Sequence, residues 1–296
     1  MSQSGHEYVL ESHGYRAVIT QAGATLRELQ CEGRDLIVGF PEGAMASAGR
    51  GQHLIPWPNR IRDGKYEYAD RSHQLPLSEP ARANSSHGLT RWACWNATQH
   101  TADTVAMGYQ LMAQPGYPWA LSLQIRYTVD ASGLNVAVEA TNLSDSPAPY
   151  AYGAHPYLTT GSETIDDNTL VVSTSAFVEV DPDRLLPTRT TAVAGTSLDF
   201  AAGKTLSGIA LDTAFATQGP LALILTNSAG QGVRLWGDEA IKWVQFYTAD
   251  DNPAMARHAL AAEPMTAPPD AFNSKVDLIH LAPGATHTLT WGIAAI

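Results

Sequence analysis

The sequence contains a glutamate whose surroundings suit proton transfer. The segment Ala259-Leu-Ala-Ala-Glu263-Pro264 places the Glu263 carboxylate directly behind four apolar residues. Partial desolvation at such a position raises the pKa of a carboxyl group toward the range of a general base. A glutamate that caps a strand end in solvent is the alternative. The apolar run favours the functional interpretation.

A histidine lies in a second unusual segment, Ala151-Tyr-Gly-Ala-His155-Pro156-Tyr157. Pro156 restrains His155 to an extended backbone, and two tyrosines bracket the imidazole. The alternative is a core histidine at a strand end. Because imidazole, aromatic rings and glycine are concentrated in so few residues, we interpret His155 as a pocket residue.

A proline-rich loop, Gly51-Gln-His-Leu-Ile-Pro-Trp57-Pro-Asn59-Arg60-Ile-Arg-Asp-Gly64, presents residues suited to a polyhydroxylated ring. The prolines beside Trp57 fix an extended backbone. The indole offers an apolar platform, and Arg60 offers several donors in a planar fork. On this segment alone, a plain surface arginine on a rigid loop is an equally good interpretation.

Two further signals are weaker. The segment Asn84-Ser-Ser-His87-Gly88-Leu89 joins a histidine to a glycine, which lets the backbone turn closely around a ligand. The segment Leu211-Asp212-Thr-Ala-Phe215 places a carboxylate near an aromatic ring, where it can accept hydrogen bonds from sugar hydroxyls. Taken singly, a loop histidine is more often a plain hydrogen-bonding residue, and an aspartate in such a turn is more often a local cap.

Short strands must position these residues, because apolar and polar residues alternate along much of the chain. Residues 121–129 and 134–140 alternate in this way around Asp130-Ala-Ser-Gly133, which predicts a hairpin with one buried face. Many short strands and few helical periods predict a sandwich or barrel, in one domain over residues 1–296. Similar strand-like runs occupy residues 15–19, 36–38, 169–173, 221–226, 233–236, 243–247 and 287–293, and residues 192–206 are loop-like.

The charge of the chain limits its partners. A formal net charge of −11 over 296 residues disfavours nucleic acid and anionic membrane surfaces. A neutral small molecule fits best, although one local arginine can still bind one anion.

The first ten residues lack the basic region and the apolar region that a secretory signal contains. No run of apolar residues approaches the ~18–20 that a membrane span needs. The cytoplasm is the expected location. Exposed strand edges allow a homodimer, and nothing in the pattern selects one edge.

Together these segments resemble the aldose 1-epimerase (galactose mutarotase) family, in the order of that family. The resemblance runs from the region of Tyr15 to the C-terminus. Asn59-Arg60-Ile61 is similar to its Asn-Arg-Ile element, His87-Gly88 to its first His-Gly, and His155-Pro156-Tyr157 to its second histidine. Asp212 with Phe215 is similar to its Asp-x-x-Phe, and Glu263-Pro264 with Pro269-Asp270-Ala271 and Asn273 to its Glu-Pro…Pro-Asp-Ala…Asn element.

The resemblance implies an all-β fold, a large antiparallel β-sandwich of the galactose mutarotase-like supersandwich type, with few short helices and an open cleft for the sugar. It implies Glu263 as general base, His155 as general acid, and Arg60, His87 and Asp212 as sugar ligands, with Asn59 beside Arg60. Trp57, Tyr157 or Trp236 then covers the apolar face of the sugar. No metal and no cofactor are implied. Galactose-specific members usually carry Asn-His-x-Tyr-Phe where this chain has Ala154-His155-Pro156-Tyr157-Leu158, so the preferred sugar stays open.

The expected reaction interconverts the anomers of an aldose. Glu263 takes the proton of the anomeric hydroxyl while His155 protonates the ring oxygen; the ring opens, the C1–C2 bond rotates, and closure gives the other anomer. Three alternatives remain: a non-catalytic carbohydrate-binding module, a sugar-phosphate mutarotase, and a metal-dependent cupin-like enzyme. The second needs additional cations near Arg60, where Arg62 is the immediate candidate and Asp63 offsets it. The third normally has a His-x-His pair, which this sequence lacks.

Overall fold

The computed structural model describes residues 2–296, so Met1, the first residue of the expected single domain, lies outside the described residues. Within this range the chain is almost entirely strands and loops. Its helices in residues 2–296 are a short α-helix, α1 (Ala271–Ser274), and a 3-10 turn at Pro80–Arg82. The all-β prediction with few short helices is confirmed.

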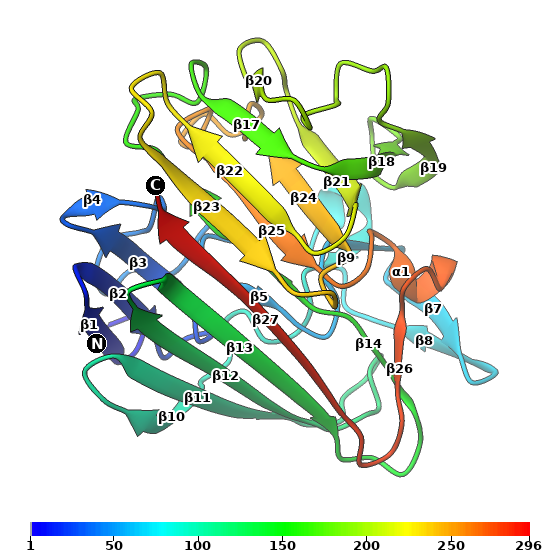
Figure 1. The fold of residues 1–296 in the computed structure, drawn as a ribbon. Helices are drawn as coiled ribbons and strands as arrows, with labels where there is room; N and C mark the ends of the chain where they lie inside the picture. The colour runs from blue at the N-terminus through cyan, green and yellow to red at the C-terminus, as the bar shows by residue number, and fades with distance from the viewer. Residues whose placement is uncertain (1) are drawn as a thin grey trace.

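One large antiparallel sheet has its long strands side by side across the middle of Figure 1. Along β12 and β13, buried residues alternate with partly or fully exposed ones, so one face of the sheet packs into the core. The predicted hairpin is confirmed, because Asp130 pairs with Gly133 at its end. In spatial order the strands are β10 (Asn96–His100), β11 (Thr104–Leu111), β12 (Leu121–Asp130), β13 (Gly133–Asn142), β27 (Thr286–Ala295), β23 (Gly232–Gly237), β22 (Ala222–Thr226), β17 (Thr169–Val172) and β20 (Lys204–Thr205).

A second antiparallel sheet carries β25, which is buried at every position along its length. Side chains of both sheets, such as Leu225 and Leu235 on one and Phe215 and Phe246 on the other, belong to one hydrophobic core. This is the arrangement of a sandwich. In spatial order the strands are β19 (Pro187–Ala192), β18 (Thr174–Val180), β21 (Asp212–Thr217), β24 (Trp243–Tyr247), β25 (Leu260–Met265), β15 (Gly153–Ala154) and β5 (His53–Leu54), and β16 (Tyr157–Leu158) also pairs with β25.

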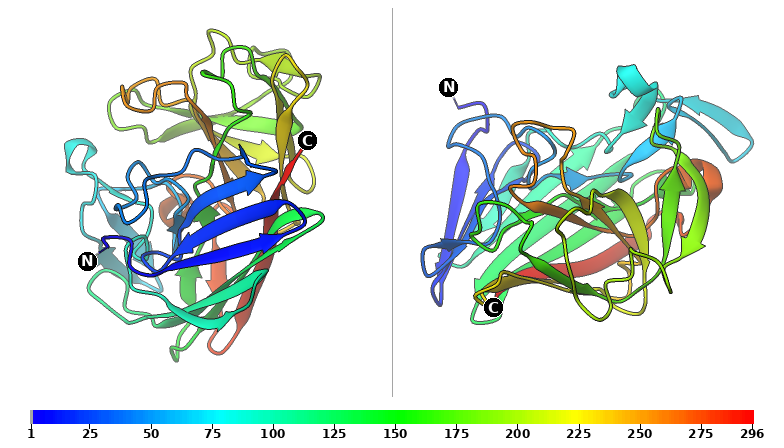
Figure 2. Two further views of the ribbon diagram at one scale, coloured as in Figure 1. Left: turned by 90° about the vertical axis from the view of Figure 1, so that its left-hand side faces the viewer. Right: turned by 90° about the horizontal axis from the view of Figure 1, so that it is seen from above.

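Smaller sheets complete the molecule. An N-terminal sheet packs its first two strands against β11, β12 and β13 (Figure 2). It comprises β1 (Glu7–Ser12), β2 (Tyr15–Thr20), β3 (Leu26–Cys31) and β4 (Arg34–Asp35). Short antiparallel pairs are formed by β6 (Arg60–Arg62) with β9 (Asn84–Ser86), β7 (Lys65–Tyr68) with β8 (Arg71–Gln74), and β14 (Ala148–Tyr150) with β26 (Ile279–Leu281).

The strand predicted at residues 36–38 is wrong. The chain there forms one isolated bridge, between Ile37 and Leu158, and the Val38 N–H donates to the Tyr157 carbonyl. Leu36 and Ile37 are buried, and beyond this single bridge their apolar character reflects core packing and not a ladder. The other predicted runs coincide with strands to within a few residues, and the loop at residues 192–206 contains the short β20. No helix within residues 2–296 has the length and apolar character needed to cross a membrane.

Candidate active site

A cleft of about 440 Å³ opens beside the second sheet, and most of the predicted site residues line it. This volume suits a small organic ligand. The predicted residues at its wall are Asn59, Arg60, His87, His155, Tyr157, Asp212 and Glu263. They come from separate strands and loops, and the fold brings them together.

Adjacent strands of the second sheet place the carboxylates. Glu263 lies in the buried β25 and pairs with Gln245 on β24. Asp212 begins β21, which pairs with the other edge of β24. Gln245 Nε2 donates to Asp212 Oδ1 at 2.5 Å, so this glutamine links the two carboxylate positions.

The central feature of the cleft is a contact between His155 and Glu263. His155 Nε2 lies 3.2 Å from Glu263 Oε1, and the residues are only 5% and 2% exposed. His155 lies between β15 and β16, both of which pair with β25, so the sheet fixes this separation. Glu263 Oε2 and His155 Nδ1 are buried and have no hydrogen-bond partner among the described residues. Buried polar atoms without partners suit a site that completes its hydrogen bonds with a ligand.

Burial shifts both groups of this pair toward their neutral forms. Burial, with a smaller contribution from Arg91, lowers the pKa of His155 to about 3. Burial, helped by the nearby Asp212 carboxylate, raises the pKa of Glu263 well above its ordinary value, and Arg60 opposes this shift. Since the groups touch, they titrate as a unit. The pair therefore keeps one proton at pH values where an ordinary glutamate has already lost it.

Arg60 forms the charged wall of the cleft. Its guanidinium binds Glu79 twice, at 2.8 Å and 3.2 Å, and lies 3.7 Å from Asp212 Oδ2. These carboxylates raise the pKa of Arg60 although its burial acts in the opposite direction. Burial raises the pKa of Asp212 against the attraction of Arg60. The result is a cation with a fixed orientation between two carboxylates.

The segment around Asp270 stabilises the backbone that carries Arg60. The Asp270 N–H donates to the Arg60 carbonyl at 2.8 Å, and Asp270 Oδ1 accepts from the Arg62 N–H at 3.0 Å. Asn273 Nδ2 also donates to Asp270 Oδ1, at 2.7 Å. The segment that resembles the Pro-Asp-Ala…Asn element therefore holds β6 in place and does not form part of the cleft wall.

His87 and Asn59 are joined by two hydrogen bonds. The His87 N–H donates to the Asn59 carbonyl at 2.9 Å, and the Asn59 N–H donates to His87 Nδ1 at 3.2 Å. Because Nδ1 accepts, Nε2 carries the proton of the neutral ring. The His87 ring meets the His155 ring edge to face at 5.6 Å. At Gly88, with φ +70°, a Cβ would lie 2.1 Å from the Ile55 carbonyl oxygen, so this tight turn requires glycine.

Tyr157 and Gly49 hold the His155 ring. The Tyr157 ring stacks on it at 5.0 Å with an 18° angle, and the Tyr157 hydroxyl donates to the Ala48 carbonyl at 2.8 Å. The Gly49 backbone also packs against the imidazole, since a Cβ there would lie 2.6 Å from His155 Cδ2. The ring is therefore confined, and Tyr157 has a positioning role as well as a place in the wall.

Trp57 and Trp236 do not lie at the cleft, and this corrects the prediction that they cover a sugar. Trp57 is 2% exposed and packs on Phe272 at 5.6 Å, because burial of a large apolar ring outweighs its display on a rigid loop. Trp236 lies on β23 of the other sheet and packs over Gly292. The aromatic side chains at the cleft that the motifs missed are Trp92, which is 51% exposed, and Tyr247.

The sequence reasoning also missed Glu79 and Arg91. Both line the cleft, yet neither belongs to a recognisable motif. Glu79 precedes Pro80 in an irregular segment, and its role appears only through its contact with Arg60. A charged residue on a loop gives no signal of its partner, so spacing alone does not identify either residue.

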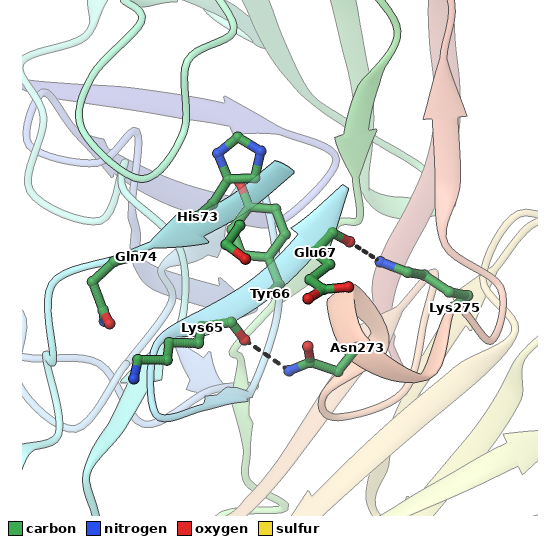
Figure 3. Close-up of a pocket in the computed structure, with 8 residues that line it drawn as sticks. Lys65, Tyr66, Glu67, His73, Gln74, Asn273 and Lys275 are labelled. Atoms are coloured by element: carbon green, nitrogen blue, oxygen red, sulfur yellow. Dashed lines mark hydrogen bonds between the residues drawn. The ribbon is translucent and has the colours of Figure 1, made fainter. Parts of the chain in front are cut away.

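A second hollow, of about 530 Å³, lies beside the β7–β8 hairpin (Figure 3). Its Lys275 ammonium donates to the carbonyls of Glu67 and Phe272, at 2.6 Å and 2.5 Å. Asn273 Nδ2 donates to the Lys65 carbonyl at 3.0 Å. These polar groups serve the local fold, so the cleft around His155 and Glu263 is the better candidate. Across residues 2–296, no group of three or more His, Cys, Asp or Glu side chains is arranged to hold a metal ion.

The chain is similar to known proteins over nearly its whole length. The model of the aldose 1-epimerase family matches residues 6–294. The uncharacterized protein YihR of Escherichia coli (strain K12) is 34% identical over 296 residues, covering 99% of this chain and 94% of that protein.

Solved structures share the fold. The GalM/aldose epimerase homologue from C. elegans is 22% identical, with a TM-score of 0.85 over 98% of this chain and 99% of that one. Galactose 1-epimerase from Lactobacillus acidophilus NCFM is 21% identical, with a TM-score of 0.77 over 96% of this chain and 92% of that one. At these identities the likeness establishes the fold alone.

Proposed function

The chain belongs to the aldose 1-epimerase family, and from this premise we propose that it interconverts the α and β anomers of an aldose by acid–base ring opening and closure. The observation that carries the proposal is the buried contact of 3.2 Å between His155 Nε2 and Glu263 Oε1 inside a ligand-sized cleft. Sugar binding alone has little need of such a pair, because burying a carboxyl beside an imidazole costs stability.

The proton held by this pair matches the two halves of the reaction. With the proton on His155, the Glu263 carboxylate accepts the proton of the anomeric hydroxyl while the imidazolium protonates the ring oxygen. The C1–O5 bond breaks, and the open aldehyde lies beside a neutral imidazole and a protonated Glu263. Rotation about C1–C2 then presents the other face of C1 to the O5 hydroxyl. The same proton transfers in reverse close the ring on that face. The pair ends with the same single proton, so no proton is exchanged with solvent.

Surrounding charges set the balance between the two forms of the pair. Burial favours the neutral form, which is the form that acts on the open aldehyde. Arg60 stabilises the Glu263 carboxylate, which is the form that acts on the closed ring. A base and an acid that are both close to their working protonation states each contribute about 10²–10⁴-fold in rate.

The remaining polar groups are suited to hold sugar hydroxyls. The Arg60 and Asp212 side chains present donors and acceptors at the cleft, and each is fixed by a neighbour, Glu79 and Gln245 respectively. We assign to His87 the role of a hydrogen-bond donor through Nε2, because Nδ1 already accepts from Asn59. Groups with fixed orientations lose little entropy when they bind a ligand.

The test is to dissolve single anomers of a panel of aldoses and follow their equilibration by polarimetry or NMR. We expect faster equilibration of at least one aldose with the wild-type protein, and loss of this acceleration in Glu263→Gln. Glu263→Gln keeps the size and polarity of the side chain and removes its basic oxygen. Binding of aldoses without acceleration of any would overturn the proposal in favour of a carbohydrate-binding module.

A further inference from the structure

Arg91 differs from the other arginines of the cleft, because no acidic side chain within residues 2–296 forms an ion pair with it. Arg60 and Arg82 both contact Glu79, at 2.8 Å and 3.3 Å. Arg91 also lines the cleft, and among the described residues no carboxylate lies within ion-pairing distance of its guanidinium. Burial lowers the pKa of Arg91 to about 10, so it stays charged at neutral pH. An unpaired, partly buried cation at a ligand site suits an anion.

Neighbouring residues fix Arg91 in this position. Its guanidinium stacks on the Trp92 ring, with Cζ 4.3 Å from the ring centroid. Stacking on one face leaves the N–H donors free in the plane of the group. Gln52, which is buried, donates through Nε2 to the Arg91 carbonyl at 2.9 Å, and the indole Nε1 of Trp92 donates to the Ala46 carbonyl at 3.4 Å. The side chain is therefore held in a built site with its donors unused.

We propose, on the premise that the chain is a mutarotase, that its substrate is an aldose with a singly charged oxyanion on the C5 substituent, and that Arg91 binds this group. The position follows from the neighbours of Arg91. Gln52, which donates to the Arg91 carbonyl, accepts a hydrogen bond from the His155 N–H at 3.0 Å, and Arg91 lines the same cleft as His155 and His87. In the proposed reaction His155 protonates the ring oxygen, which is bonded to C1 and to C5. A cation beside His155 therefore faces the substituent on C5.

The charge of the anion follows from the local balance. One guanidinium compensates one negative charge, and the other cations of the cleft already pair with Glu79 and Asp212. A dianionic phosphate would leave a charge uncompensated near these carboxylates and Glu263. A carboxylate, a sulfonate or a sulfate ester carries a single charge and accepts two parallel hydrogen bonds from a guanidinium. The net charge of the whole chain favours a neutral aldose, and the charge at Arg91 leads us to the opposite proposal.

The experiment compares anomer exchange of glucose with that of its 6-carboxylate, 6-sulfonate, 6-sulfate and 6-phosphate counterparts, by NMR at equilibrium. We expect kcat/KM for at least one singly charged aldose to exceed that for glucose by about 10- to 100-fold, the usual effect of a hydrogen bond to a charged group. In Arg91→Gln we expect the ratio of the two kcat/KM values to fall by a similar factor. The control Arg71→Gln removes one exposed charge on β8 and should leave the ratio unchanged.

Binding of methyl glycosides, which cannot open their rings, keeps the proposal testable if a variant is inactive. Calorimetry with the methyl glucosides of the anionic series should give tighter binding than methyl glucoside, and Arg91→Gln should abolish the difference. Faster exchange of glucose than of every anionic aldose, or a clear preference for the phosphate, would overturn this inference and leave the mutarotase assignment standing. No acceleration of any aldose would overturn the mutarotase assignment itself.

Discussion

Substituting Gly49 with alanine should disable the site without touching a reacting atom. At Gly49, with φ +75°, a Cβ would lie 2.6 Å from Cδ2 and 2.9 Å from Nε2 of His155. Ordinary contact begins near 3.4 Å, so the imidazole must move by about 0.8 Å, the difference between 3.4 and 2.6 Å. Tyr157, stacked at 5.0 Å, limits the room for this movement.

The displaced ring breaks its alignment with Glu263, which lies only 3.2 Å away. A misplacement of about 1 Å lowers kcat by roughly 10²-fold, and we expect a loss of this order in Gly49→Ala. Anomer exchange measured by NMR gives the rate, and circular dichroism gives the folded fraction. KM should change less than kcat, because the sugar ligands Arg60 and Asp212 are untouched.

Gly195→Ala is the matched control. Gly195 has φ +76°, and a Cβ there would meet nothing within 4 Å. Both variants therefore carry the same backbone strain of about 1–2 kcal/mol, but only one contacts the imidazole. Equal activity of the two variants, at equal folded fractions, would refute the reasoning.

Three further predictions follow from the buried ionisable groups. Glu263→Gln should raise the free energy of unfolding at neutral pH by up to about 3 kcal/mol, because the raised pKa of Glu263 makes this carboxyl destabilising once the pH exceeds its ordinary value; a lower urea midpoint than wild type would contradict this. Activity should fall at acid pH only where the His155–Glu263 pair takes up a second proton, near the His155 pKa of about 3. At alkaline pH, activity should fall only above the raised pKa of Glu263, where the pair loses its single proton. An inflection in kcat/KM near about pH 6.5, the ordinary pKa of histidine, would count against the shared proton. Burial lowers the folded-state pKa of His53 to about 3, so its contribution to stability should be complete above about pH 6.5 and decline as the pH falls toward about 3, with a loss of about 2 kcal/mol by about pH 5; equal urea midpoints at about pH 6.5 and about pH 5 would refute this.

Period-2 alternation is why much of the fold was predictable. It identified β12 and β13 with their connecting hairpin, because one face of each strand packs into the core. It failed at residues 36–38, where apolar side chains are buried beneath an irregular segment and not in a ladder. The order of the strands depends on pairings between distant segments, such as β13 with β27, which local pattern does not reveal.

The site was predictable where a motif combined chemistry with backbone restraint, as at His155-Pro156 and Glu263-Pro264. It was not predictable where the partner lies on another loop, as Glu79 does for Arg60. The position of Trp236 could have been predicted from alternation. Val233 and Leu235 on the same strand are fully buried, so alternation places Trp236 on the opposite face of that strand. This strand belongs to the sheet that does not form the cleft.

The central claim is that Glu263 and His155 act as one proton-sharing unit. The most direct test is the anomer-exchange rate of the preferred aldose in Glu263→Gln, His155→Asn and the double variant. Each single substitution should lower kcat by about 10²–10⁴-fold, and the double variant should be no slower than the slower single one, because the first change already disables the pair. Losses that multiply in the double variant, or full activity in either single one, would contradict the account.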